Sequence, residues 1–547
     1  MKNKLTFLLL LFSTLLLIPQ VSQTQNIERS VDALVASYHQ PFGPGIAVSV
    51  VKEGAIIYRK ETGLANLEYD NPITDSTVFH VASVSKQFAV FAILLLGEEG
   101  KLSLDDDIRQ HIEELSNFKY KISIRQLANH TSGFRNTFDL ANLKGIDNEH
   151  LMSQEEMVDL LLRQQDLNFL PGAKFEYCNA GFVLLAEIVK NVSGQSFADF
   201  TQERIFAPLK MKHSLFLDDP SLVIKNKAYS YRQSNEGYRK IPLNRTVVGA
   251  TGLNTTPHDL SLWAMNFDQP IIGSQQIFAK MKAPSRLNSG EKIPYALGQE
   301  TKSYRGLEVV FHGGGDAGYR AYLLRIPQHQ FSVMVMGNAE SFNPLDISYG
   351  IVDLYLSDFL SPLSEPVIPQ YNNKDLERFE GDYQVFSGLY IRLIAQEDSL
   401  YLQPYGTEDL LKLPVIGENA FSFPYIPHSK IVFDDQGVKW HFSDFAYAGK
   451  KITLSPPKAA DLDLSTYLGI FESTEIETSY TFILKEKKLI ATHPFNQDIT
   501  LKPIAEDAFI TDSGFFSRVE YIRDKKGQVI GCEISGQNAL GIWFQKK

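Results

Sequence analysis

The spacing of hydrophobic and polar residues predicts a sheet whose strands come from both ends of one large region. Apolar positions follow the pattern of strands at residues 45–51, 55–61, 307–312, 319–326 and 331–337. Helical patterns are found at residues 27–38, 154–164, 180–192 and 345–359. We therefore expect an α/β (α+β) domain, in which an antiparallel sheet is flanked by helices and a helical lobe is inserted between the two sets of strands.

The pattern changes near residue 362, where Pro362, Pro366 and Pro369 lie close together. Short strand-like segments follow, and a motif that starts at Leu376 returns 88 residues later at Leu464. The matching pairs are Leu376 and Leu464, Phe379 and Tyr467, Gly381 and Gly469, Tyr383 and Phe471, and, further on, Leu413 and Leu501, Ile416 and Ile504, and Phe421 and Phe509. Two copies favour two all-β, barrel-like modules over a solenoid, which normally needs about three or more repeats.

The first residues have the layout of a secretory signal peptide. Lys2 and Lys4 precede an apolar stretch from Leu5 to Ile18, and Pro19 and small or polar residues follow. We therefore expect export, to the periplasm or the medium, and no later segment is long and apolar enough for a transmembrane span. The expected parts are a signal peptide at 1–23, a catalytic domain at 24–362, a linker at 363–374, and β-modules at 375–455 and 462–547.

Composition narrows the class of protein further. The chain has 547 residues, 44% of them hydrophobic, and its formal charge is −11 without a marked basic run, which argues against nucleic acid as a partner. Cys178 and Cys532 are the two cysteines, so disulfides are not the expected stabilising device. The zinc motif His-Glu-x-x-His and the elbow Gly-x-Ser-x-Gly are both absent, and we expect no metal and no cofactor.

The first candidate for chemistry is Ser83, which precedes a stretch that is apolar from Gln87 until Gly97. That stretch predicts a buried helix, and Lys86 would lie on the same helical face as Ser83, within reach of its hydroxyl. A desolvated lysine amine can take the proton of a serine and make it a nucleophile. The same Ser-x-x-Lys spacing occurs at two places that lack a following buried helix, Ser116/Lys119 and Ser455/Lys458.

The second candidate is Tyr177 with Asn179, in a loop that leads into the helix expected near Ala180. In an extended segment these two side chains would point the same way and enter one cleft together. A tyrosine acts as a base near neutral pH only if a cation such as Lys86 stabilises its phenolate. The alternative is an ordinary helix-capping Asn beside a packed Tyr, and Tyr371-Asn372-Asn373 also fits the spacing.

The third candidate begins at His312, after an expected strand, and continues through Gly313, Gly314 and Gly315. The stretch formally contains the dinucleotide fingerprint Gly-x-Gly-x-x-Gly, but a strand rather than a helix is expected from Tyr319 onward, which excludes that interpretation. Glycines after a strand also allow a substrate backbone to approach closely. The alternative for His312 is a structural histidine.

Together the three stretches resemble the serine β-lactamase and penicillin-binding protein superfamily, in its class C-like branch. The resemblance covers roughly residues 28–360 and includes two accessory segments, 124–134 and 249–260. It implies a β-lactamase/transpeptidase-like catalytic domain. The paired C-terminal modules resemble those of D-aminopeptidase-like members, on architecture alone.

The resemblance also implies a role for each residue. Ser83 would be acylated, Lys86 and Tyr177 would move its proton, Asn179 would hold Lys86 and the substrate amide, and His312 would give electrostatic support. Backbone N–H groups of Ser83 and Gly315 would form the oxyanion hole, and Gly313 and Gly314 would contact the substrate. Gly313 and Gly315 stand where penicillin-recognising members commonly carry a hydroxyl residue, which lowers the expectation of a dedicated β-lactamase.

The expected function is an exported serine hydrolase acting on peptide, amide or ester bonds, in particular a D-aminopeptidase or a D-Ala-D-Ala carboxypeptidase. Its partner would be a small-molecule or peptide substrate, peptidoglycan fragments among them. A β-lactamase or esterase of the same fold is the alternative within the enzyme class. A non-catalytic sensor or peptidoglycan-binding protein is the alternative of another class, and the oligomeric state stays open.

Overall fold

The computed structural model describes residues 25–38, 40, 42–363, 367–385, 389–405, 407–424, 429–434, 437–442, 445–454, 456–457 and 462–547. The expected signal peptide therefore lies outside the described residues. Contacts divide the chain into two compact units. The first unit is Met1–Ser132, Asn148–Val158 and Leu170–Pro362, and the second is Gly133–Asp147, Asp159–Phe169 and Leu363–Lys547.

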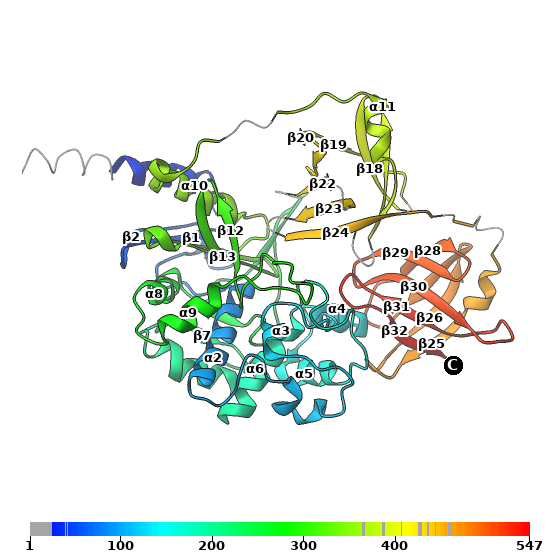
Figure 1. Cartoon of the computed structure of the whole chain (residues 1–547), viewed down its shortest axis with the longest axis horizontal. Helices are drawn as coiled ribbons and strands as arrows, with labels where there is room; N and C mark the ends of the chain where they lie inside the picture. Colours follow the sequence, from blue (N-terminus) through cyan, green and yellow to red (C-terminus); the bar gives the residue numbers. More distant parts are fainter. Residues whose placement is uncertain are drawn as a thin grey trace, which may run out of the picture. The chain divides into compact units, whose positions relative to one another are not determined.

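The first unit is built on a six-stranded sheet with the order β12-β13-β14-β15-β1-β2 (Figure 1). Its strands are β1 (Ile46–Lys52), β2 (Ala55–Thr62), β12 (Glu300–Tyr304), β13 (Leu307–Asp316), β14 (Tyr319–Ile326) and β15 (Phe331–Gly337). The N-terminal hairpin joins the later strands through antiparallel pairing of β1 with β15, in which Ile46 lies opposite Gly337. The prediction of one sheet with strands from both ends of the region is confirmed.

The two faces of this sheet are covered by different helices (Figure 1). Val48 and Val50 of β1 pack into a core with the helix at residues 25–36 and with α10 (Pro344–Tyr355). Ser49 points to the opposite face, where its Oγ lies 2.9 Å from Ser261 Oγ of α8 (Pro257–Asp268). Alternation along one strand thus decides which helix packs on which face.

The inserted lobe is mainly helical. The helices between β2 and β12 include α2 (Lys86–Glu98), α3 (Ile124–Ala128), α5 (Gln154–Leu162), α6 (Ala180–Ser193), α7 (Phe197–Thr201), α8 and α9 (Gln275–Lys282). Short strands accompany them: β3 (Leu64–Asn66), β4 (Asn71–Pro72), β5 (Phe79–His80), β6 (Met152–Ser153), β7 (Leu215–Phe216), β8 (Tyr231–Ser234), β9 (Gly237–Lys240), β10 (Arg245–Thr246) and β11 (Leu253–Thr255). Strand β11 lies between β5 and β7, and β6 pairs with β10.

The second unit contains two β-modules. The first module begins at α11 (Asn373–Leu376) and has nine strands: β16 (Gly381–Gln384), β17 (Tyr390–Gln396), β18 (Ser399–Pro404), β19 (Leu411–Leu413), β20 (Val415–Gly417), β21 (Ala420–Ser422), β22 (Lys430–Asp434), β23 (Gly437–Phe442) and β24 (Phe445–Ile452). The two ends of this sheet are β19 and β20, which are joined in the chain by Pro414 alone. The sheet therefore curls around one core as a nearly closed barrel.

The second module is a closed eight-stranded barrel. Its strands are β25 (Gly469–Ser473), β26 (Thr478–Lys485), β27 (Lys488–Thr492), β28 (Ile499–Ala505), β29 (Ala508–Ser513), β30 (Phe516–Arg523), β31 (Val529–Ser535) and β32 (Ile542–Lys546). The sequence repeat marks equivalent places in the two modules: Gly381 and Gly469 start their first strands with φ of 134° and 128°, a conformation that favours glycine. The predicted pair of barrel-like modules is confirmed.

The second unit also includes two segments from within the expected catalytic domain. Segment 133–147, which contains α4 (Thr137–Lys144), packs with the second module. Arg135 is 4% exposed, and its guanidinium forms an ion pair with Glu475 at 2.5 Å and donates to the carbonyls of Leu540 and Gly541. The boundary expected at residue 362 remains a proposal, because these contacts tie earlier residues to the module.

No helix within the part of the chain that the structure describes is both long and apolar enough to cross a membrane.

Candidate active site

Ser83 lies in a 3₁₀ turn, Ala82–Ser85, that leads directly into α2. The helix forms where expected, since its residues from Lys86 to Leu96 are all buried, but Ser83 precedes it instead of belonging to its first turn. Ala82 has a φ of 46°, which is unusual for a residue with a side chain, so the chain turns sharply immediately before Ser83. Ser83 itself is partly exposed.

Lys86 is fully buried, and its Nζ has three oxygen partners. It lies 2.9 Å from Ser83 Oγ, 2.8 Å from Asn179 Oδ1 and 2.8 Å from the carbonyl oxygen of Ala250. Burial lowers the pKa of Lys86 to about 7, against smaller opposing effects of Cys178 and Asp316. The amine is therefore partly neutral at physiological pH.

The partners of Lys86 decide where its lone pair points when the amine is neutral. The amide oxygen of Asn179 and the carbonyl of Ala250 can only accept hydrogen bonds, so they take the two remaining N–H groups. The lone pair then faces Ser83 Oγ and can accept the hydroxyl proton. This is the arrangement required of a general base that activates a serine.

Asn179 and Tyr177 both lie against Lys86, although the segment between them is not an extended strand. Asn179 is the residue before α6, with helical φ and ψ of −74° and −26°, and its side chain makes no capping hydrogen bond. The capping alternative is therefore wrong for Asn179. The ring centroid of Tyr177 lies 4.9 Å from Lys86 Nζ, within the range of a cation–π contact.

His312 is 1% exposed and is held on both sides of its ring. Its Nδ1 lies 2.6 Å from the carbonyl oxygen of Gly313, and its Nε2 lies 2.9 Å from the hydroxyl of Tyr295. Burial, aided by the charge of Lys86, lowers the pKa of His312 to about 3. The ring is therefore neutral: Nδ1–H donates to Gly313, and Nε2 accepts from Tyr295. Any electrostatic support from His312 has to come from its dipole.

The glycines of β13 allow the strand to lie against the turn that carries Ser83. A Cβ added to Gly314 would lie 2.2 Å from the carbonyl oxygen of Val81 and 3.2 Å from the amide nitrogen of Ser83. The sequence predicts that these glycines let a substrate backbone approach closely. At Gly314 the close neighbour is instead the protein's own backbone at Val81. At Gly313 and Gly315 an added Cβ would meet nothing nearer than 3.4 Å.

The structure adds residues to the site that sequence reasoning did not single out. Tyr295 had no signal in its surroundings, whereas Ala250 and His130 lie within the two accessory segments. The His130 ring is buried, 4.2 Å from the ring of Tyr177 and 4.4 Å from that of Tyr295. It therefore supports the face of Tyr177 that is turned into the protein. All the site residues belong to the first unit.

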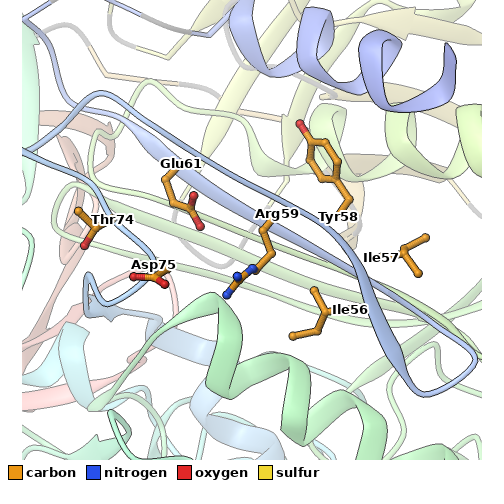
Figure 2. A pocket seen from close by; sticks show the side chains of 7 residues that line it. All are labelled: Ile56, Ile57, Tyr58, Arg59, Glu61, Thr74 and Asp75. Atoms are coloured by element: carbon orange, nitrogen blue, oxygen red, sulfur yellow. The ribbon is translucent and has the colours of Figure 1, made fainter. Parts of the chain in front are cut away.

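A separate hollow of about 580 Å³ borders the edge strand β2 (Figure 2). It is lined by Ile56, Ile57, Tyr58, Arg59, Glu61, Thr74 and Asp75. Figure 2 shows Arg59 on the side of Asp75 and Tyr58 pointing the opposite way, where its hydroxyl donates to Asp32 at 2.9 Å. None of the site residues lines this hollow, so it has no part in the chemistry of Ser83.

The chain is similar in sequence to known proteins. The family model described as Beta-lactamase matches residues 27–353. The chain is similar to a D-aminopeptidase of Brucella anthropi, with 27% identity over 538 residues that cover 94% of this chain and 98% of that protein. It is also similar to a D-aminopeptidase of Gluconobacter oxydans (strain 621H), with 29% identity over 318 residues, 58% of this chain and 59% of that protein.

A solved structure shows the same fold. The octameric penicillin-binding protein homologue from Pyrococcus abyssi superposes with a TM-score of 0.54 at 23% identity, over 86% of this chain and 98% of that one. At this level of identity the likeness concerns the fold alone.

Proposed function

The chain belongs to the beta-lactamase family and is a serine hydrolase, and we propose that it is a D-amino-acid peptidase that acts through an acyl-enzyme on Ser83. The observation that carries the proposal is the contact between Lys86 Nζ and Ser83 Oγ at 2.9 Å, with the other two partners of the amine unable to donate. The D-aminopeptidases of similar sequence support the substrate class.

The proposed reaction starts with attack of Ser83 Oγ on the carbonyl carbon of the substrate, while the hydroxyl proton passes to Lys86. The negative charge moves to the carbonyl oxygen, which the backbone N–H groups of Ser83 and Gly315 would stabilise. Collapse of this intermediate breaks the C–N bond, and the departing amine takes a proton relayed through Tyr177. Water then gives a proton to the base and attacks the ester carbon, the bond from that carbon to Ser83 Oγ breaks, the acid leaves, and Oγ takes the proton back.

Two roles are proposed around this centre. Asn179 would orient Lys86 and bind the substrate amide, since its oxygen already receives the amine. His312 would act through position and dipole because it is neutral, and Gly313 would line the path of the substrate backbone. Each of these roles predicts a loss of turnover on substitution without loss of the Ser83 nucleophile.

The test uses a fluorophosphonate probe and a substrate panel on the full chain. We expect one adduct on Ser83 and none in Ser83→Ala, and faster hydrolysis of D-alanine amide than of the L enantiomer. Comparison of D-amino acid amides with D-Ala-D-Ala peptides distinguishes an aminopeptidase from a carboxypeptidase. Labelling of Ser83→Ala at the wild-type rate would refute the nucleophile, and a preference for the L enantiomer would refute the substrate class.

Nitrocefin and a short ester are added to the same substrate panel to test the β-lactamase and esterase alternatives. We expect nitrocefin to be a poor substrate, because Gly313 and Gly315 offer no hydroxyl for a substrate carboxylate. Nitrocefin turnover with kcat/KM near the enzymatic upper range of about 10⁸ M⁻¹s⁻¹ would instead make the protein a β-lactamase. A full chain that acylates nothing would favour the non-catalytic sensor.

Export is proposed from the N-terminal sequence alone, and the place of action would be the periplasm or the medium. Fractionation of expressing cells, with N-terminal sequencing of the exported protein, tests this. A protein found in the cytoplasm with residues 1–23 still attached would contradict it.

A further inference from the structure

A cluster of buried polar side chains lies beside the acylation site and has no role in the chemistry above. Asp316 ends β13, and its carboxylate accepts hydrogen bonds from Arg245 Nη2 at 3.2 Å and from Thr251 Oγ1 at 3.3 Å. His80 Nε2 lies 3.0 Å from Thr251 Oγ1 and 3.4 Å from Asp316 Oδ2. The side chains of His80, Arg245 and Asp316 are between 5% and 11% exposed, so water screens them little.

The protonation states of the cluster follow from its contacts. Burial lowers the pKa of His80, so the ring is neutral near pH 7 and its Nε2–H can donate to Thr251, whose hydroxyl donates to Asp316. Burial alone would raise the pKa of Asp316, but His80 and Arg245 hold it well below its usual range. The cluster therefore contains one lasting negative charge, on Asp316, paired with the positive charge of Arg245.

Each neutral or negative member of the cluster is close in sequence to a group of the site. His80 on β5 is followed three residues later by Ser83. Thr251 follows Ala250, whose carbonyl receives Lys86, and Asp316 follows Gly315. The segments come from distant parts of the chain, and they are held together by the contacts of Asp316 with Thr251 and His80 and by the hydrogen bond between Thr251 and His80.

We propose that Asp316 is a positioning residue of the acylation site: it joins the segments that carry Ser83, the Ala250 carbonyl and Gly315, and it places a buried negative charge near Lys86. This inference rests on the proposed function. A negative charge favours the ammonium form of Lys86, so Asp316 would oppose the effect of burial and keep the amine basic enough to take a proton from Ser83.

Other ionisable groups surround this pair. Those that face Lys86 or Asp316 from neighbouring elements are Tyr177, Cys178, His130, His312, His80, Arg245, Tyr319 and Arg320, and Lys227 acts on His80. Burial lowers the pKa of His130 and of His312, so neither adds a charge near neutral pH. Asp316 is thus the carboxylate in this set.

The test measures the labelling rate of Ser83 by a fluorophosphonate as a function of pH in charge variants. Asp316→Asn removes the anion and keeps the positive charge of Arg245, so the acid limb of the profile should move to lower pH, by about half a unit to one unit. Arg245→Gln removes the positive charge beside Asp316 and keeps the anion, so the limb should move to higher pH. Thr251→Val and Arg245→Lys keep both charges, and their limbs should stay in place.

The opposite signs separate this role from simple damage. A merely structural defect would lower the maximum labelling rate of a variant. It would not move the acid limb of Asp316→Asn to lower pH and that of Arg245→Gln to higher pH. If the acid limbs of these two variants stay in place or move in the same direction, the inference is wrong. Labelling of Ser83 in the wild type would still support the proposed nucleophile. If Asp316→Asn does not fold, the upward shift of Arg245→Gln against Arg245→Lys decides the matter. A wild type that is not labelled on Ser83 overturns the proposed function first, and the inference with it.

Discussion

Replacement of Lys86 by methionine is expected to abolish acylation of Ser83 and to change how the stability of the protein depends on pH. Methionine has similar length and no charge, so it fills the same space without an ammonium group to desolvate. The pKa of Lys86 falls from 10.5 to about 7 on burial, and one pKa unit corresponds to about 1.4 kcal/mol. Burial of the amine therefore costs about 4 kcal/mol of unfolding free energy at pH 7.

Part of this gain is offset, because methionine cannot donate to Asn179 Oδ1 or to the carbonyl of Ala250. Each of the two lost hydrogen bonds costs about 1 to 3 kcal/mol, so together they are comparable with the desolvation gain, and we expect a net change within about 2 kcal/mol of zero at pH 7. The pH dependence is the sharper readout. Between the two pKa values the unfolded chain binds more protons than the folded one, so the wild type gains stability as the pH rises and the methionine variant does not.

The unfolding free energy of Lys86→Met minus that of the wild type should therefore fall by about 2 kcal/mol between pH 7 and pH 9. Urea unfolding followed by circular dichroism at both pH values measures this difference. If the two units unfold separately, the transition of the unit that contains Lys86 is the one compared. Lys101→Met is the control: that side chain is 48% exposed, and the substitution should leave the pH dependence unchanged. A difference that does not vary with pH would show that Lys86 stays charged in the folded protein, and the argument for a neutral base would fail.

Three further outcomes are expected. Tyr177→Phe should lower kcat by about 10²- to 10⁴-fold with a smaller change in KM, the usual loss of a proton-transfer group; a change in KM alone would make Tyr177 a binding residue. Gly314→Ala should abolish labelling of Ser83 in a protein that still folds, because the added methyl group meets the Val81 carbonyl at 2.2 Å; normal labelling would contradict the close approach of β13. A chain ended near residue 365 should melt at a lower temperature than the full chain, because the buried Arg135 loses Glu475, and breaking a buried pair costs about 3 to 5 kcal/mol. The folded fraction of this shortened chain should still react with a small probe at Ser83. An unchanged melting temperature would refute the importance of the contact between Arg135 and Glu475.

Local sequence patterns were sufficient for the parts of the site that lie close together in the chain. Ser83 and Lys86 are three residues apart in front of an apolar helix, and that spacing alone places the amine near the hydroxyl. Alternation predicted the strands, and the repeat after residue 362 predicted two similar barrels, because both signals arise from side chains that alternate between a core and solvent.

Contacts between distant residues needed the tertiary structure. The carbonyl of Ala250 that orients Lys86, the hydroxyl of Tyr295 that fixes His312, and the link between Arg135 and Glu475 join residues that no local spacing relates. The neutral state of His312 and the lowered pKa of Lys86 depend on burial, which the packing of several elements decides. The sequence by itself pointed to the residues that we propose for the chemistry and to the main strands of the sheet. The tertiary structure decided the protonation and the partners of these residues, because desolvation and long-range hydrogen bonds exist only once the chain has folded.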